Sequence, residues 1–394
     1  MGNEYGSQII TSEHIELLDN LQRNTFQYFL DLANRENGLI ADSTWESAPS
    51  SIAAIGFGLP SYAVGVEHGW ISRDEAVERT LAAMRFFRSS TQSPEPDSAG
   101  YQGFYYHFLD IHTGQRLWEC ELSTIDTVLL LLGVLAAAQY FDRDTPYEQE
   151  IRQAADDLYK RVNWHWAQNH ASTVSHGWKP ETGFLENRWQ GYDEALLLYI
   201  LGLAAPQNRL SDDSYQAYAS TYRWESLYGY EFLYAAPLFI HHFSHVWIDF
   251  RGLQDDFMRV HNIDYFENSR RAIFAHQQHA IQNPNRFKGY GENSWGITAS
   301  EGPVQGPDRV EINDKSFYGY LARGVPQPDD GTLSPWTAIT SLPFAPEIAM
   351  PAIAHYWQAY ENLRGKYGMK CSLNLSFTGS SPSGWFSDHY YGIN

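Results

Sequence analysis

The sequence predicts an all-α fold in which the helices form a ring, the arrangement called an α/α toroid. Helix signals dominate the chain, and strand-like sequence is confined to short inserts between the helices. Segments that are apolar on every side alternate with amphipathic segments. An inner ring of buried helices backed by an outer ring of solvent-facing helices produces this alternation. We therefore expect residues 1–394 to form a single domain.

The amphipathic helices are marked by their N-terminal caps. Residues 13–32 place leucines and aromatic residues on one stripe. Serine, threonine and aspartate accept hydrogen bonds from the free N–H groups of a first helical turn, and a glutamate three residues later strengthens the signal. The predicted caps are Ser12, Ser72, Thr145 and Asp264, and the helix after the last of them is expected to stop before Pro284.

The buried helices are the segments without a polar face. Residues 128–138 and 195–205 are apolar on every side, which predicts burial on every side. The segments that follow them, around residues 151–162 and 211–222, are more polar, as is typical of helices that face solvent. Further apolar segments are residues 51–66, 233–240 and 345–357.

Two inserts carry the strand-like sequence. Residues 103–122 predict a β-hairpin around His112–Gln115, and the Gly- and Trp-rich residues 176–189 predict a second hairpin. Functional residues are concentrated on the loops that a rigid scaffold presents. We expect both hairpins on one rim of the helical ring.

The charge excludes several classes of partner. Lys and Arg number 27 against 47 Asp and Glu, a net charge of −20. Neutralisation of phosphates dominates nucleic-acid affinity, and anionic lipid also repels such a chain, so we expect neither nucleic acid nor a membrane as a partner. Two cysteines, Cys120 and Cys371, rule out a disulfide scaffold and a multi-cysteine metal site.

No targeting segment is evident. The longest apolar run, Val128–Ala138, is shorter than the ~20 residues that a membrane span needs. The first six residues lack the basic and then apolar run of a secretory signal. An exported protein without its signal peptide would show the same start, so the compartment stays open.

Aromatic residues are unusually frequent. The chain has 13 Trp, 26 Tyr and 21 Phe, together 15% of its residues. Flat side chains with polar tips suit the C–H faces of sugar rings, and they equally suit the filling of a large core. Composition alone leaves both interpretations open.

Acidic residues lie beside aromatic residues in five segments. Two carboxylates across a sugar-binding cleft are the groups that glycosidic-bond cleavage requires: one protonates the leaving oxygen, and the other activates water or attacks the anomeric carbon. The segments are residues 118–126, 186–194, 245–252, 289–303 and 384–391.

Each candidate also has a structural interpretation. Asp126 completes a Ser-x-x-Asp capping box that begins at Ser123, so it is either a helix cap or a sugar ligand. Glu194 falls in the first turn of an apolar helix, where the helix dipole would lower its pKa unless a larger desolvation effect opposes it. His241 and His245 have the spacing of metal ligands, but the glutamate of the H-E-x-x-H motif is absent.

A family resemblance sharpens these alternatives. The segments are IAAIGFGLPSY, ELSTIDT, GYDEALLLYILGL, HVWIDFRG, DYFENSRRA, FKGYGENSWGITASEGP and TSLPFAPE. In this order they resemble the signature blocks of the bacterial glycoamylase-like family, which includes the endo-β-1,2-glucanases of glycoside hydrolase family 144. The resemblance spans residues 52–392. It implies an (α/α)6 toroid, hydrolysis with inversion, no metal or organic cofactor, and an oligo- or polysaccharide substrate.

The resemblance also assigns roles to residues. Glu194 in GYDEA matches the expected general acid, and Asp388 in the block WFSDHYYGI matches the expected general base. We expect substrate-binding residues from the matched blocks and from the acidic and aromatic inserts. They are Glu121, Asp126, Trp189, Tyr192, Arg251, Glu292, Trp295, Glu301 and Trp385.

Two features depart from the family pattern. Asp193 stands where members often carry asparagine, which places a second carboxylate beside the expected acid. Members usually continue beyond the YYGI block into a closing helix, whereas the sequence stops at Asn394. We therefore expect either a ring that lacks this helix or a truncated sequence.

The sequence predicts an inverting endo-glycosidase that acts on a β-glucan, with β-1,2-glucan as the expected substrate. An exo-acting glucoamylase-like hydrolase, a polysaccharide lyase on the same toroid and a non-catalytic glycan-binding protein are the alternatives. The family suggests a periplasmic or secreted location. The oligomeric state stays open.

Overall fold

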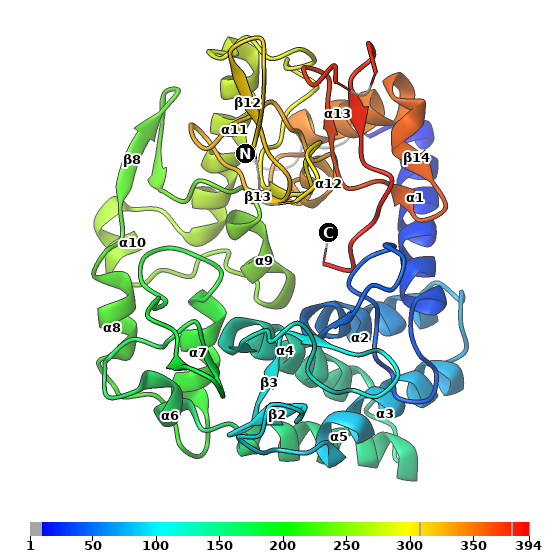
Figure 1. The fold of residues 1–394 in the computed structure, drawn as a ribbon, viewed down its shortest axis with the longest axis vertical. Coiled ribbons are helices and arrows are strands. Elements are labelled where there is room, and N and C mark those ends of the chain that lie inside the picture. Colours follow the sequence, from blue (N-terminus) through cyan, green and yellow to red (C-terminus); the bar gives the residue numbers. More distant parts are fainter. Residues whose placement is uncertain (1–9, 307–308, 380, 394) are drawn as a thin grey trace. The chain divides into compact units, whose positions relative to one another are not determined.

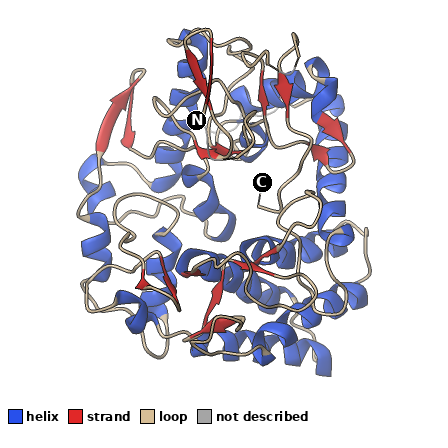
Figure 2. Ribbon diagram, in the orientation of Figure 1, coloured by secondary structure: helices blue, strands red, loops and turns tan. Residues whose placement is uncertain are grey.

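The structure is a computed structural model that describes residues 10–306, 309–379 and 381–393. It is mostly helical with small sheets (Figures 1 and 2). Its contacts group into two compact units, which we call the 26–221 unit and the 222–390 unit. Residues 391–393 belong to the first, and the chain up to Thr25 belongs to the second. Asn394, where a closing helix was expected to be missing, lies outside the described residues.

Four long helices form the frame of the 26–221 unit: α2 (Ile52–Glu67), α3 (Arg73–Ser89), α4 (Thr124–Tyr140) and α5 (Pro146–Arg161). They pack against one another in the lower part of Figure 1. Helices α2 and α4 touch through glycine, since a Cβ on Gly133 would lie 2.0 Å from the carbonyl oxygen of Gly56. This close approach explains glycine inside two buried helices, where it otherwise weakens a helix.

The shorter helices of this unit are α6 (Trp164–Gln168), α7 (Leu196–Ala204) and α8 (Ser214–Ala219). Two of the predicted caps are confirmed here: Ser72 accepts a hydrogen bond from the N–H of Glu75, and Thr145 accepts one from the N–H of Glu148. The prediction for Ser12 is wrong by one residue, because the hydroxyl of Thr11 accepts the hydrogen bond from the N–H of His14. Helix α4 is buried over most of its length, as its apolar sequence predicts.

Both predicted hairpins enter one antiparallel sheet. Its order is β2 (Gly100–Tyr101), β3 (Phe104–Tyr106), β5 (Leu122–Ser123), β6 (Gly177–Lys179) and β7 (Gly183–Phe184). Tyr106 pairs with Leu122, which in turn pairs with Trp178. The second insert therefore lies directly against the first. A separate pair joins β1 (Ser50–Ser51) to β4 (Phe108–Leu109).

The 222–390 unit also contains six α-helices within its described residues. They are the greater part of α1 (Ser12–Asp31), then α9 (Ile240–Trp247), α10 (Asp256–His261), α11 (Tyr265–Gln282), α12 (Trp336–Thr340) and α13 (Pro346–Ala359). Asp264 caps α11 as predicted, and the helix stops at Asn283 before Pro284. The core of the unit includes Trp295, Ile353 and Tyr356.

Short two-stranded sheets connect these helices. The strands are β8 (Trp224–Leu227), β9 (Tyr230–Leu233), β10 (Ala299–Ser300), β11 (Val310–Ile312), β12 (Lys315–Phe317), β13 (Leu321–Ala322), β14 (Arg364–Gly365), β15 (Gly368–Met369), β16 (Leu373–Asn374) and β17 (Trp385–Phe386). A 3₁₀ turn, η1 (Glu361–Leu363), precedes β14.

The helical class is confirmed, with two differences: strands β8 to β17 lie outside the two predicted inserts, and one apolar segment does not form a helix. The apolar segment 233–240 is divided between the end of β9 and the start of α9 rather than forming one helix. Pro237 interrupts it, because proline lacks the N–H that a helix interior needs. No helix of the described residues is both long and apolar enough to cross a bilayer.

Candidate active site

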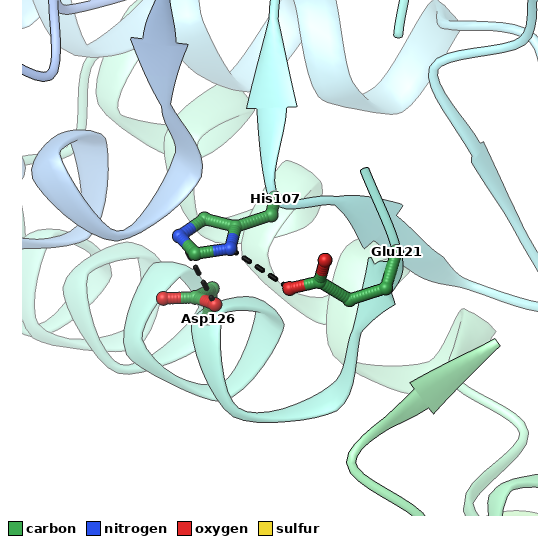
Figure 3. Close-up of side chains that lie close together, drawn as sticks. All are labelled: His107, Glu121 and Asp126. Carbon is green, nitrogen blue, oxygen red and sulfur yellow. Dashed lines mark hydrogen bonds and ion pairs between the residues drawn. The ribbon is translucent and has the colours of Figure 1, made fainter. Parts of the chain in front are cut away.

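An ionisable cluster lies at the sheet of the 26–221 unit (Figure 3). The imidazole of His107 lies between two carboxylates: its Nδ1 is 2.9 Å from Oε1 of Glu121, and its Nε2 is 3.6 Å from Oδ2 of Asp126. All three side chains are partly exposed, at 29%, 28% and 13%. The cluster is thus sheltered from water but open to a ligand.

The sheet register explains how these residues meet. His107 follows β3, Glu121 precedes β5, and these strands pair antiparallel. The backbone N–H of His107 donates to the carbonyl oxygen of Glu121 at 3.0 Å. Asp126 lies in the first turn of α4, which begins directly after β5. Pairing of the two strands therefore places all three side chains together.

Asp126 takes part in the start of α4, the structural role that its sequence predicted, and it also faces His107. Ser123 caps α4 by accepting a hydrogen bond from the backbone N–H of Asp126, and its hydroxyl donates to the Asp126 carboxylate at 2.5 Å. The same carboxylate oxygen faces His107. Asp126 therefore belongs to the helix start and to the ionisable cluster at once.

Glu194 is a desolvated acid at the entrance to helix α7. It lies in a turn two residues before Leu196, where the helix starts. Burial raises the pKa of Glu194, and the negative charge of Asp126 raises it further, whereas a hydrogen bond from its own backbone N–H lowers it. The pKa is about 7. Desolvation thus outweighs the stabilisation that the helix N-terminus offers to an anion. A carboxyl group with this pKa holds a proton near neutral pH.

Asp193 is the second desolvated acid of this turn. Burial and the neighbouring charge of Glu194 raise its pKa, although its Oδ1 accepts a hydrogen bond from the N–H of Ala195 at 3.0 Å. The two adjacent carboxyls share the energetic cost of burial, so at least one of them favours the protonated form near neutral pH.

We expect Glu194→Gln to stabilise the fold at pH 8. A buried acid with a raised pKa binds its proton more tightly in the folded chain, so its unfavourable contribution grows as the pH rises from about 4.5 to about 7. The amide removes this cost, which amounts to roughly 1–3 kcal/mol. Thermal unfolding at pH 8 and pH 4 measures the effect, and an equal shift at both pH values would contradict it.

Other residues of the cluster escaped the sequence analysis. Burial raises the pKa of Asp42 to about 6; the charge of His107 acts against this rise and that of Asp126 adds to it. Trp118 is 68% exposed and lies 5.3 Å, ring centre to ring centre, from Phe108, which stacks on His107. No motif marked His107 or Asp42, whereas Trp118 belonged to an acidic and aromatic segment already noted.

Two of the aromatic residues predicted to bind substrate are largely buried. Trp189 is 7% exposed, stacks on His176 at 3.7 Å, and donates its indole N–H to the hydroxyl of Thr124 at 2.9 Å. Tyr192 is 8% exposed. Both rings are therefore largely buried instead of presenting a broad face to solvent, and Trp189 contacts the start of α4.

Within the 222–390 unit, Asp388 lies on the loop that follows β17. Its side chain is 84% exposed, and its Oδ1 is 3.0 Å from the ammonium group of Lys370. The hydroxyl of Ser387 donates to Glu301 at 2.5 Å. Burial raises the pKa of Glu301, the Ser387 hydrogen bond lowers it, and the charge of Asp388 raises it. Glu301 and Asp388 thus form a second acidic pair.

Two other predicted residues lie on the surface of this unit. Arg251 is exposed, contacts Asp249 at 2.9 Å, and borders a pocket of about 480 Å³ that also contains Phe266 and Phe344. The side chain of Glu292 is exposed, and its backbone carbonyl accepts a hydrogen bond from Gln277. Neither residue contacts the Glu301–Asp388 pair through a described hydrogen bond or ion pair.

The remaining two tryptophans differ in exposure. Trp385 is half-buried in β17, which pairs with β16, two residues from Ser387. Trp295 is fully buried in the core, and its carbonyl accepts a hydrogen bond from the hydroxyl of Tyr356 at 2.8 Å. Contrary to the sequence-based expectation, Trp295 packs the core and lines no surface, because its Gly-rich segment folds inward.

We expect Trp295→Ala to lower the free energy of unfolding by about 3–5 kcal/mol, the usual cost of removing a buried tryptophan side chain. The half-buried Trp385→Ala should cost clearly less. Chemical denaturation of both variants measures the difference. Equal and small losses would show that Trp295 is not a core residue.

The described residues contain one group of three side chains with ligand atoms close enough to share a metal ion: His107, Glu121 and Asp126, within 4.8 Å of one another. His241 and His245, spaced like metal ligands in the sequence, instead face separate partners. His241 Nε2 lies 3.2 Å from the carbonyl of Ala235, and His245 Nε2 lies 3.0 Å from the hydroxyl of Ser269.

Comparison with known proteins shows that this chain is similar to enzymes named for their action on β-1,2-glucans. An "Exo beta-1,2-glucooligosaccharide sophorohydrolase (non-reducing end)" of Parabacteroides distasonis is 26% identical over 415 residues, which cover 96% of this chain and 53% of that protein. The chain thus spans about half the length of this curated relative.

Solved structures of related proteins are also similar to this chain. The endo-β-1,2-glucanase of Chitinophaga pinensis, in complex with sophorotriose and glucose, superposes with a TM-score of 0.82 at 26% identity, covering 96% of this chain and 90% of that chain. A Bacteroides uniformis protein described as a "putative glucoamylase" superposes with a TM-score of 0.84 at 28% identity, covering 96% and 89%.

A family model shows the relationship directly. The Glycoamylase model, described as "Putative glucoamylase", matches residues 186–394. This match covers more than half of the 394 residues and includes the turn of Glu194 and the loop of Asp388. The chain therefore belongs to the glycoamylase family.

Proposed function

We propose that this chain is a glycoside hydrolase that cleaves β-1,2-linked glucan with inversion of configuration. The observation that carries the proposal is the environment of Glu194, whose pKa is raised to about 7 by burial and by the charge of Asp126. A carboxyl group that keeps its proton near neutral pH is the group that can protonate a leaving glycosidic oxygen. The named activities of the relatives support the linkage.

In this mechanism each acid has one task. Glu194 donates its proton to the oxygen of the scissile bond, and Asp388 accepts a proton from the attacking water. Exposure and the contact with Lys370 suit Asp388 to the ionised state that a base requires. An inverting enzyme needs space for water, so we expect about 6.5–9.5 Å between the carboxyls, or a longer gap bridged by a substrate hydroxyl.

Substrate contacts follow from the same proposal. Glu121 and Asp126 present carboxylate oxygens at the partly exposed cluster, where they can accept hydrogen bonds from sugar hydroxyls. Glu301 accepts a hydrogen bond from Ser387, the residue before Asp388, and Trp385 lies two residues before Ser387 in the sequence. We further propose that the two units belong to one (α/α)6 toroid, as the similarity to the solved glucanase supports.

The mode of action is the open part of the proposal. We favour endo cleavage, the activity named for the Chitinophaga pinensis relative. Exo cleavage, which releases sophorose from a chain end, is the named activity of the curated relative and the alternative for this chain. Products from long β-1,2-glucan distinguish the two: endo cleavage gives a ladder of oligosaccharides, and exo cleavage gives sophorose from the first time point.

The decisive experiment compares hydrolysis with binding over a panel of β-1,2-, β-1,3-, β-1,4- and α-1,4-glucans. We expect reducing-sugar release from β-1,2-glucan alone, with the α-anomer as the first product in proton NMR spectra. Binding without release would identify a glycan-binding protein. Unsaturated products would identify a lyase, and release of the β-anomer first would exclude inversion.

A further inference from the structure

The surroundings of His107 favour its charged form. Its Nδ1 is 2.9 Å from the Glu121 carboxylate, and its Nε2 is 3.6 Å from the Asp126 carboxylate (Figure 3). A neutral imidazole has a single N–H, so one nitrogen would present its lone pair to a carboxylate oxygen. With both nitrogens protonated, each contact joins a positive group to a negative one.

The ring is held in this orientation by its surroundings. Phe108 stacks on it with ring centres 3.9 Å apart and planes 12° apart. The backbone of His107 donates to the carbonyl of Glu121 and accepts a hydrogen bond from Ile52 N–H at 3.3 Å. A turn of the ring would break the Glu121 hydrogen bond and the stack together. The ring is therefore a fixed bridge between the two carboxylates.

We propose that His107 is a positioning residue that is charged at neutral pH: its imidazolium bridges Glu121 and Asp126 and holds both carboxylates oriented toward the hydroxyls of a bound sugar. This role rests on the proposed function for the substrate, but the charge state does not. The relatives' names assign nothing to this histidine.

The charged groups that act on the ring all raise the pKa of His107 and so stabilise its charged form. Burial alone would lower the pKa of His107, but the charge of Asp126, the hydrogen bond and charge of Glu121, and the charge of Asp42 raise it to about 9. In return, the histidine opposes the effect of burial on Glu121, whose pKa falls below its usual value, with a further contribution from Lys179.

The charge balance predicts what removal of the imidazolium does. Asp42, Glu121 and Asp126 carry three negative charges when ionised, and His107 reduces the net charge of the cluster to −2. His107→Gln keeps hydrogen-bonding groups but leaves −3 in a sheltered site. Protons then bind the carboxylates more readily, so the cluster loses its ionised form at a higher pH.

A metal ion is the competing explanation of the same three residues. An imidazole binds a metal through one nitrogen, and the other nitrogen then faces outward to a hydrogen-bond acceptor. Here each nitrogen faces a different carboxylate, with the ring between them. An ion shared by the three residues would take the lone pair of one ring nitrogen, so a bound metal and the imidazolium exclude each other, and metal binding measured by calorimetry distinguishes them.

The first test measures the charge itself and needs no substrate. Two-dimensional NMR of the full chain labelled with ¹⁵N-histidine, assigned by the loss of one signal in His107→Gln, reports both ring nitrogens. We expect both to be protonated at pH 7, with a midpoint near 9. A ring with one protonated nitrogen at pH 7, or a midpoint below 7, overturns the proposal.

The second test measures the consequence on β-1,2-glucan. We expect His107→Gln to raise KM about tenfold with kcat changed less than threefold, and to move the acidic limit of kcat/KM up by about one pH unit. The double variant His107→Gln/Asp42→Asn restores a net charge of −2 and should return the acidic limit toward that of the wild type. His165→Gln, an exposed histidine on α6, is the matched control without an effect.

The remaining outcomes separate the proposals. An unmoved acidic limit in His107→Gln overturns the positioning role. Micromolar binding of Mn²⁺, Zn²⁺ or Ca²⁺ that His107→Gln abolishes, measured by calorimetry, overturns it in favour of a metal site. Absence of hydrolysis in the wild type, with the expected NMR titration, contradicts the proposed function and leaves the charge state of His107 established.

Discussion

Glu194→Gln should lower kcat on β-1,2-glucan by about 10²–10⁴-fold, the usual contribution of a general acid. The amide preserves the size of the side chain and removes the proton that the leaving oxygen needs. Because the contribution is made in the transition state, KM should change little. Initial rates of reducing-sugar release and substrate binding by calorimetry measure the two effects.

Asp193→Asn is the matched control. It removes the neighbouring desolvated carboxyl, and the amide oxygen can still accept the hydrogen bond from Ala195. We expect turnover within a few-fold of the wild type. If Asp193→Asn instead abolished hydrolysis and Glu194→Gln retained it, the two adjacent acids would have exchanged roles.

The pH profile gives an independent check of the same residue. The alkaline limit of kcat/KM in the wild type should lie near the Glu194 pKa of about 7, because the acid is inactive once it has lost its proton. An aryl glycoside whose leaving group needs no protonation should be less sensitive to Glu194→Gln. Equal loss on activated and natural substrates would argue against a general acid.

Asp388→Asn should produce a loss of similar size, about 10²–10⁴-fold in kcat, because the amide cannot accept a proton from water. Asp256→Asn is a suitable control, since Asp256 is also an exposed aspartate in an ion pair, with Arg259 on α10. An inverting enzyme that lacks its base can be rescued by a small external anion. Recovery of the rate with azide, giving a glycosyl azide of inverted configuration, would identify Asp388 as the base. Near-wild-type hydrolysis by Asp388→Asn would place that role on another residue, with Asp126 the next candidate.

The sequence predicted the helix starts because their signals are local. A cap needs one side chain and a backbone N–H three residues away, as at Ser72 with Glu75 and at Asp264 with Glu267. The hairpin of β8 and β9 escaped notice, although its strands Trp224–Leu227 and Tyr230–Leu233 alternate around a Tyr-Gly turn. Its residues are mostly half-buried, so they lack the clear alternation of apolar and polar residues that marks a strand.

The candidate site was predicted only where its residues belong to local sequence motifs. Glu194 and Asp388 came from motifs, and Asp126 came from a capping box whose second role was open. His107 carried no motif, because its importance comes from strand pairing with residues 122 and 123. Trp295 looked like a loop residue among glycines, yet the hydrogen bond from Tyr356, 61 positions away, fixes its segment in the core.

The sequence by itself determined the helical class, the acidic charge, the two inserts and the family. These depend on local periodicity, composition and motifs. Tertiary structure alone decided which acid keeps its proton and which histidine carries a charge. The pKa of a side chain depends on the water it has lost and on the charges that face it, and both follow from contacts between distant segments. Glu194 is desolvated beside Asp126, 68 positions before it, and His107 is charged because two strands bring Glu121 and Asp126 to either side of its ring.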